Sequence, residues 1–189
     1  LYNATDFPQA VQSILALVGE TMGISRAYIF ENEEGGEVTS NTFEWCSEGI
    51  EPQKERLQVY PYVIDGRDYR DNFNEDGIFY CQDVDKLTGW ERELFREQGI
   101  LSSLQCAIQS GGHFLGFAGI DDCSVKRMWT REQINALVFE GKLLAVFLLK
   151  NRAQEELSES LAVCRDINAC KQEPGKQVMA IPDTDETDM

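Results

Sequence analysis

Apolar residues near the start of the chain recur with the spacing of an amphipathic helix. The series consists of Phe7, Ala10, Val11, Ile14, Leu15, Leu17, Val18 and Met22. Asp6 can act as the N-cap, Pro8 is tolerated in the first turn, and Gly23 can end the helix in a left-handed conformation. The i, i+3, i+4, i+7 pattern therefore predicts a first helix over about 7–22.

Five shorter segments are rich in β-branched and aromatic residues, which is typical of strands. They cover 26–31, 38–46, 78–81, 100–109 and 113–121. A Gly-Gly pair separates the first two segments and another separates the last two, so both connections favour hairpin turns. Gly116 and Gly119 lie inside the last segment and predict a bulge or the close approach of another backbone.

Two capping-box patterns, Thr88–Glu91 and Thr130–Gln133, mark the starts of further helices. The first predicts a short helix that ends before Gly99. The second predicts a long helix from about Arg131 to about Ile167. The first half of this helix is apolar over much of its circumference, whereas its second half is polar with a thin apolar stripe.

The segment 47–76 lacks a regular period and mixes Pro, Gly, Asp and aromatic residues. A loop of this length in a compact domain is typical of a lid or a binding loop. The order of elements predicts an α+β sandwich in which helices pack on a mostly antiparallel sheet. We expect a domain over 1–152, a helical linker over 153–170 and an acidic flexible linker over 171–189.

The formal net charge of −16 limits the expected partners. Such an acidic surface repels nucleic acid and anionic lipid headgroups, so we expect no nucleic-acid binding and no direct membrane contact. The chain also has no initiator Met, no signal peptide and no apolar run of the ~20 residues that a membrane span needs. These features predict a cytoplasmic fragment of a larger protein.

The reactive residues do not form a catalytic or metal-binding motif. The six cysteines include no Cys-x-x-Cys pair, and His113 is the single histidine, so we expect no metal site and free thiols. No phosphate-binding loop of the GxxxxGK[ST] type is present. The sequence therefore predicts that this chain is not itself an enzyme.

Three stretches, taken in order, resemble the GAF domain family. They are GISRAYIF (23–30), FEWCSEGIEPQ (43–53) and GHFLGFAGIDDC (112–123), the last followed by RMWTRE (127–132). The resemblance covers about 7–152. It is to the subgroup of GAF domains found beside PAS, histidine kinase and diguanylate cyclase (GGDEF) modules in bacterial sensors.

The resemblance implies a six-stranded antiparallel sheet with two unequal faces. The first and last helices would pack on one face and form a parallel homodimer, and the last helix would carry the signal to a linked effector domain. The other face, under the irregular segment, would hold a small-molecule pocket. The residues expected to line this pocket are Tyr28, Phe30, Phe43, Trp45, Tyr80, Cys106, Phe117 and Asp121.

The alternation along the first strand agrees with this arrangement. Tyr28 and Phe30 share one side of the strand, and the smaller Ala27 and Ile29 share the other, which suits close helix packing. The aromatic side is then left for the pocket. The alternative is that these aromatic residues are plain core.

The sequence identifies no cofactor, and the ligand is an unknown small molecule. Bilin-binding GAF domains attach the chromophore to a cysteine that is commonly followed by a histidine, and no cysteine of this chain is followed by a histidine. The segment 72–76 matches the signature of cyclic-nucleotide GAF domains only superficially. A haem ligand is equally hard to place, because His113 falls on a predicted turn.

Two other functions remain open at this stage. The chain could be a ligandless dimerisation spacer, or its cysteines could form a thiol redox sensor or a methionine sulfoxide reductase site. Asp121 and Asp122 could coordinate a ligand or could bind backbone N–H groups of the next turn. Arg127 is expected to fix the entry to the last helix by pairing with Asp122.

Overall fold

The computed structural model describes residues 6–171, which form three α-helices, eight strands and three short 3-10 helices. In chain order they are α1 (Asp6–Met22), β1 (Arg26–Asn32), β2 (Val38–Cys46), η1 (Lys54–Arg56), β3 (Tyr60–Pro61), β4 (Val63–Ile64), β5 (Arg67–Asp68), η2 (Tyr69–Asn72), β6 (Ile78–Cys81), η3 (Val84–Lys86), α2 (Trp90–Glu97), β7 (Ser102–Ser110), β8 (His113–Asp122) and α3 (Arg131–Lys171). The chain divides into two units, the first ending at Phe147 and the second beginning at Leu148. The predicted linker over 171–189 lies outside the described residues, apart from Lys171.

Six of the strands form one antiparallel sheet in the order β3-β2-β1-β8-β7-β6, which confirms the predicted α+β fold. Five of them match the strands that periodicity predicted. The sixth, β3, is only two residues long and lies in the segment expected to be irregular, where no period can be read. Its Pro61 is tolerated because β3 is an edge strand. A separate hairpin, β4–β5, follows it.

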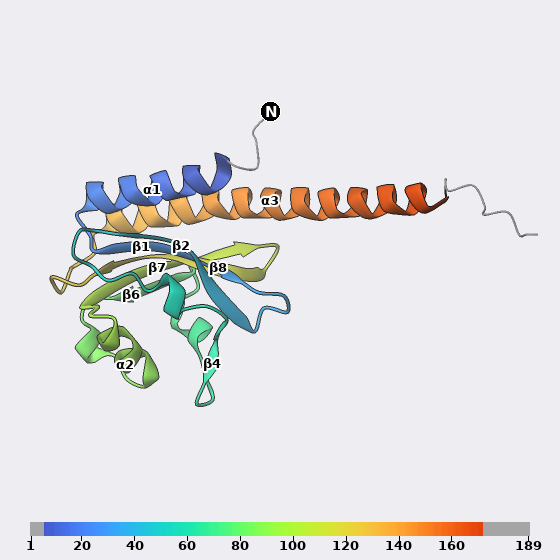
Figure 1. Ribbon diagram of the computed structural model, residues 1–189. Coiled ribbons are helices and arrows are strands. Elements are labelled where there is room, and N and C mark those ends of the chain that lie inside the picture. The colour runs from blue at the N-terminus through green and yellow to red at the C-terminus, as the bar shows by residue number, and fades with distance from the viewer. Residues whose placement is uncertain (1–5, 172–189) are drawn as a thin grey trace, which may run out of the picture. The chain divides into compact units, whose positions relative to one another are not determined.

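The two faces of the sheet are covered differently (Figure 1). α1 and the first part of α3 lie on one side, and α2 lies on the other. A Cβ atom added to Gly19 of α1 would lie 2.0 Å from the Trp45 ring, and one added to Gly141 of α3 would lie 3.1 Å from Sγ of Cys106. Close helix packing on this face therefore depends on glycine.

One of the two predicted capping boxes is confirmed. The backbone N of Thr130 donates to Oε1 of Gln133 at 2.9 Å, and the backbone N of Gln133 donates to Oγ1 of Thr130 at 3.3 Å. The box at Thr88 is wrong, because α2 begins after Gly89 without a side-chain cap. Glu91 is buried there and pairs with Arg67 instead, at 3.2 Å.

Gly116 and Gly119 occupy the close approaches that their positions in β8 predicted. A Cβ atom on Gly116 would lie 2.0 Å from the carbonyl oxygen of Phe30, and one on Gly119 would lie 2.4 Å from the Tyr28 ring. Gly119 thus makes room for the Tyr28 side chain on the face away from α1. Within the described residues, no helix is long and apolar enough to cross a membrane.

We predict that Gly116→Ala lowers the free energy of unfolding by about 3 kcal/mol or more, because it adds a backbone clash to an unfavourable φ of 144°. Gly49→Ala is the matched control, since its φ is 82° and its added Cβ would meet nothing within 4 Å. It should cost about 1 kcal/mol. Urea denaturation of both variants checks this, and equal losses would contradict the proposed clash.

Candidate functional site

A cavity of about 50 Å³ lies on the face of the sheet away from α1. Residues 51–77 and 82–101, here called the cover, close it from the other side. Its lining combines aromatic and aliphatic side chains with several charged and amide side chains. The lining residues are Arg26, Tyr28, Phe30, Thr39, Asn41, Glu44, Leu57, Tyr60, Pro61, Tyr62, Tyr69, Trp90, Leu94, Phe95, Gln98, Ile100, Gln105, Phe117 and Asp121.

Arg26 is the charged centre of this lining, and it is 2 % exposed. It shares its side of β1 with Tyr28 and Phe30, because alternate strand residues point to the same face. Ala27 and Ile29 face the opposite side and are fully buried there. The predicted division of β1 into a small helix-packing side and an aromatic side is therefore correct.

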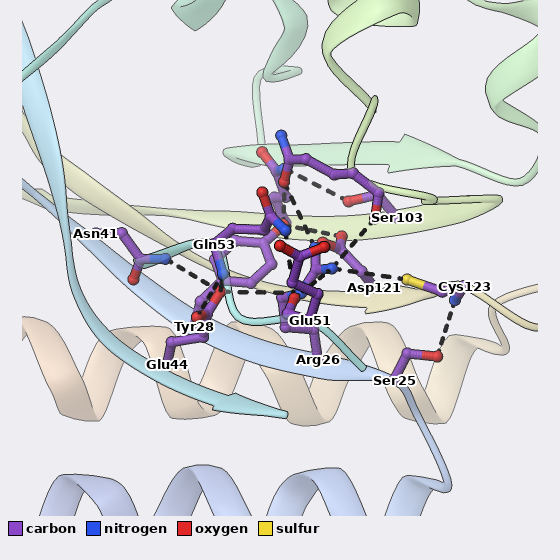
Figure 2. Close-up of polar contacts among 12 residues, drawn as sticks. Ser25, Arg26, Tyr28, Asn41, Glu44, Glu51, Gln53, Ser103, Asp121 and Cys123 are labelled. Atoms are coloured by element: carbon purple, nitrogen blue, oxygen red, sulfur yellow. Dashed lines mark hydrogen bonds and ion pairs between the residues drawn. The ribbon is translucent and has the colours of Figure 1, made fainter. Parts of the chain in front are cut away.

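The Arg26 guanidinium connects two neighbouring strands to the cover (Figure 2). Its Nη1 lies 3.6 Å from Oδ2 of Asp121 on β8, and its Nε lies 3.8 Å from Oε1 of Glu44 on β2. Its Nη2 donates to the backbone carbonyls of Glu51 at 3.3 Å and Gln98 at 3.2 Å. A single buried cation thus holds both parts of the cover against the sheet.

Glu44 also binds the cover through its carboxylate. Oε2 accepts hydrogen bonds from the backbone N–H groups of Gln53 at 2.9 Å and Lys54 at 3.0 Å, at the start of η1. Charge-assisted hydrogen bonds of this kind are stronger than neutral ones. The carboxylate therefore fixes the first part of the cover directly.

A chain of hydrogen bonds extends from Asp121 across the cavity floor. The Tyr28 hydroxyl donates to Oδ1 of Asp121 at 2.9 Å, and Nε2 of Gln105 donates to the Tyr28 hydroxyl at 3.0 Å. The Tyr69 hydroxyl, from the cover, donates to Oε1 of Gln105 at 2.8 Å. Burial raises the pKa of Asp121 to about 6, and Arg26 offsets that effect only in part.

Four of the eight residues expected in the pocket line this cavity together. They are Tyr28, Phe30, Phe117 and Asp121. The rings of Phe30 and Phe117 stack with their centroids 4.6 Å apart and form an apolar wall. Whether any of the four contacts a ligand stays a prediction.

The other four expected residues do not line this cavity, so the prediction that they share a pocket with Tyr28 needs correction. Phe43 and Trp45 point toward α1, because Tyr28 pairs with Glu44 in the observed register and the neighbours of Glu44 face the other side. Tyr80 is 39 % exposed on β6. Cys106 faces Gly141 of α3.

The site also includes three residues that were not predicted from the sequence, Arg26, Glu44 and Gln105. The available signal was alternation, since Arg26 stands two positions before Tyr28 in the same strand and must share its face. The position of Glu44 depends on the strand register, which the sequence did not fix. Gln105 depends in the same way on the pairing of β7 with β8.

Asp121 and Asp122 point to opposite faces at the end of β8. Asp122 is fully buried and accepts hydrogen bonds from the backbone of Ser124 and Val125, as the alternative interpretation of these residues expected. The predicted pair with Arg127 is confirmed, with Nε donating to Oδ2 at 2.8 Å. Arg127 also donates to the carbonyls of Met22 and Gly23 at the end of α1.

The surroundings of three cysteines disfavour thiol redox chemistry. Cys46, Cys81 and Cys123 are free thiols. Burial raises the pKa of Cys46 to about 11 and also raises the pKa of Cys81 and Cys123, which opposes the thiolate that redox chemistry needs. Within the same part of the chain, no three Asp, Glu, His or Cys side chains are grouped to hold a metal.

Comparison with known proteins places this cavity in a family context. A family model described as GAF domain matches residues 6–160. The methanogenesis regulatory histidine kinase FilI of Methanothrix harundinacea (strain 6Ac) is 33 % identical over 175 residues, which cover 87 % of this chain. The chain spans about a fifth of the length of that relative, 20 %.

Solved structures share the fold at lower sequence identity. The blue-light absorbing form of the Thermosynechococcus elongatus PixJ GAF domain matches with a TM-score of 0.63 at 18 % identity, covering 84 % of this chain and 94 % of that one. A domain of a protein described as a two-component sensor histidine kinase, from Sinorhizobium meliloti 1021, matches with a TM-score of 0.63 at 15 % identity, covering 83 % and 99 %.

We predict that the buried Asp121 makes stability depend on pH between pH 5 and 7. Because its pKa is about 6 in the folded chain and near 4 in the unfolded chain, the folded state holds the proton more tightly. Stability from this group is therefore present below about pH 4 and is lost as pH rises through about 6. The free energy of unfolding should fall by about 1 kcal/mol between pH 5 and 7.

The measurement is urea denaturation at both pH values, with Asp121→Asn and His113→Gln compared with the unsubstituted chain. Asp121→Asn should remove the fall in the free energy of unfolding between pH 5 and 7, because its amide does not titrate. His113→Gln is the control substitution, because His113 is exposed and does not line the cavity. An identical pH slope in the Asp121→Asn variant would show that another group is responsible.

Proposed function

The chain belongs to the GAF domain family, and from this premise we propose that it is the small-molecule-sensing domain of a larger histidine kinase. The observation that carries the proposal is the cavity under the cover, which combines aromatic walls with a buried Arg26 network. Ligand sites commonly combine apolar walls with a few convergent polar groups and titratable residues of shifted pKa. The relation to a histidine kinase supports that effector class, and none of the three proteins compared above is described as a diguanylate cyclase.

The end of β8 offers a physical route from the cavity to the helices. Asp121 faces the cavity and contacts Arg26, whereas Asp122 faces Arg127, which binds the end of α1. Three residues separate Arg127 from the start of α3. A ligand that moved Asp121 would therefore also shift the junction between α1 and α3. The ligand could favour the shifted junction only by the difference between its affinities for the shifted and the unshifted arrangement.

The solvent-facing side of the helices supports a homodimer as the output form. Ile14 and Leu17 of α1 are 42 % and 65 % exposed, and Phe139 and Val146 of α3 are 63 % and 64 % exposed. Large exposed apolar side chains mark interaction sites where they gather into a patch. A second copy of the chain would cover it with the same surface. A ligandless dimerisation spacer would use this face equally well. The ligand-binding test below therefore decides between a sensing domain and a spacer.

To test sensing, the chain is screened by thermal unfolding against small neutral, anionic and cationic compounds. We predict that at least one stabilises it, by about 2.7 kcal/mol at a hundred times its Kd. Leu57→Trp, which fills the cavity, should abolish the stabilisation, and Leu17→Trp on the exposed face of α1 should retain it. The spacer function is favoured if no compound stabilises the chain, or if the stabilising compound is equally effective on the Leu57→Trp variant.

To test dimerisation, Leu17→Glu places a charge on the exposed apolar face of α1. We predict that it weakens self-association at least about tenfold, because it buries an unpaired carboxylate at the interface. Val125→Glu is the matched control, since Val125 is 50 % exposed and lies outside the helices. Sedimentation equilibrium measures both, and equal association of the two variants would exclude this face.

A further inference from the structure

Three polar atoms in the cavity lining have no hydrogen-bond partner within the described part of the chain. Nε of Arg26 and Nε1 of Trp90 are donors, and Oδ1 of Asn41 is an acceptor. Asn41 is 1 % exposed. Because an unpaired buried polar atom costs stability and is rare in proteins, these atoms point to a bound group with the complementary pattern.

The side chains of Arg26 and Asn41 approach the same carboxylate oxygen. Oε1 of Glu44 is 3.8 Å from Nε of Arg26 and accepts a hydrogen bond from Nδ2 of Asn41 at 3.4 Å. That bond fixes which end of the Asn41 amide is the oxygen, since Oδ1 turned toward Glu44 would place two acceptors together. Both side chains therefore lie around one oxygen atom of the cavity lining, within reach of one small molecule.

The charges around these atoms select against ions. Arg26 is the one cationic side chain among the lining residues that the structure describes, and it already faces Glu44 and Asp121. An anion would meet two carboxylates without an unpaired cation, and a second cation would lie against the guanidinium. Burying a charge without a partner is far more costly than burying a hydrogen-bonded neutral group.

Building on the proposed sensing function, we propose that the cavity recognises a neutral carboxamide. Its carbonyl oxygen would accept from Nε of Arg26, and its N–H would donate to Oδ1 of Asn41. Its apolar substituent would pack on the stacked Phe30 and Phe117 rings. The volume of about 50 Å³ holds a group of a few heavy atoms. A larger amide would therefore require the cover to move, which links its recognition to the segment that Arg26 and Glu44 hold.

Acetamide, acetate and acetamidinium test the proposal, because they share one four-atom skeleton and differ in charge. Each is titrated into the ¹⁵N-labelled chain at pH 7 and constant ionic strength, and the amide, indole and guanidinium signals are followed by NMR. We expect acetamide to bind at least about tenfold more tightly than either ion, since the site leaves a mismatched partner unpaired. The largest shifts should fall on the Arg26 Nε–H and the Asn41 side-chain amide. Equal or tighter binding of acetate, or the absence of acetamide binding, overturns the proposal.

Variants locate the contact. Asn41→Leu removes the acceptor at similar volume and should weaken acetamide binding at least about fivefold. Asn135→Leu on the exposed side of α3 is the matched control and should leave binding unchanged. Arg26→Lys keeps the positive charge but removes Nε–H, and it should weaken acetamide binding without making acetate the preferred ligand. If Asn41→Leu fails to fold, as judged by its NMR spectrum, the shift of the Asn41 side-chain amide signal on adding acetamide to the unsubstituted chain decides, and an unshifted signal overturns the proposal.

Failure of the carboxamide proposal can be distinguished from failure of the proposed sensing function. If acetamide does not bind but a charged compound stabilises the chain and loses its effect in Leu57→Trp, the cavity is a sensor site of a different ligand class. If no compound of any charge binds in the cavity, both proposals fall together.

Discussion

The arrangement of this domain depends on one buried cation. Arg26 is the first residue of β1 and lies within 4 Å of carboxylates on β2 and β8. Its guanidinium donates to backbone carbonyls in both parts of the cover. Loss of one partner of a buried charge typically costs about 3–5 kcal/mol, because the remaining charge is left uncompensated. The network therefore sets where the cover lies on the sheet and how much space remains beneath it.

The same network gives the sheet two chemically different faces. On one face, Ala27, Ile29 and glycines of α1 and α3 allow close helix packing. On the other, tyrosine hydroxyls and Gln105 extend a polar chain from Asp121 to the cover. Because Asp121 and Asp122 are adjacent and point to opposite faces, one backbone segment belongs to both systems. This adjacency is the physical basis for expecting that events in the cavity influence the helix junction.

Much of the fold could be predicted because its signals are local. The helical period of α1, the Gly-Gly hairpins and the Thr130 capping box each depend on residues close in the chain. The wrong capping box at Thr88 shows the limit of that approach, since a tertiary pair between Glu91 and Arg67 replaces it. Two of the expected pocket residues, Phe43 and Trp45, do not line the cavity for a related reason. Their faces depend on the register of β2 against β1, which carries a bulge after Ile29 that the sequence did not reveal.

The most direct test of this account is amide hydrogen exchange of the Arg26→Met variant compared with the unsubstituted chain. The account predicts that amides in the cover, 51–77 and 82–101, exchange faster, while the amides of β1, β8 and α1 keep their protection, because Arg26 anchors the cover rather than the sheet. Unchanged protection of the cover, or an equal loss of protection over the whole domain, would contradict it.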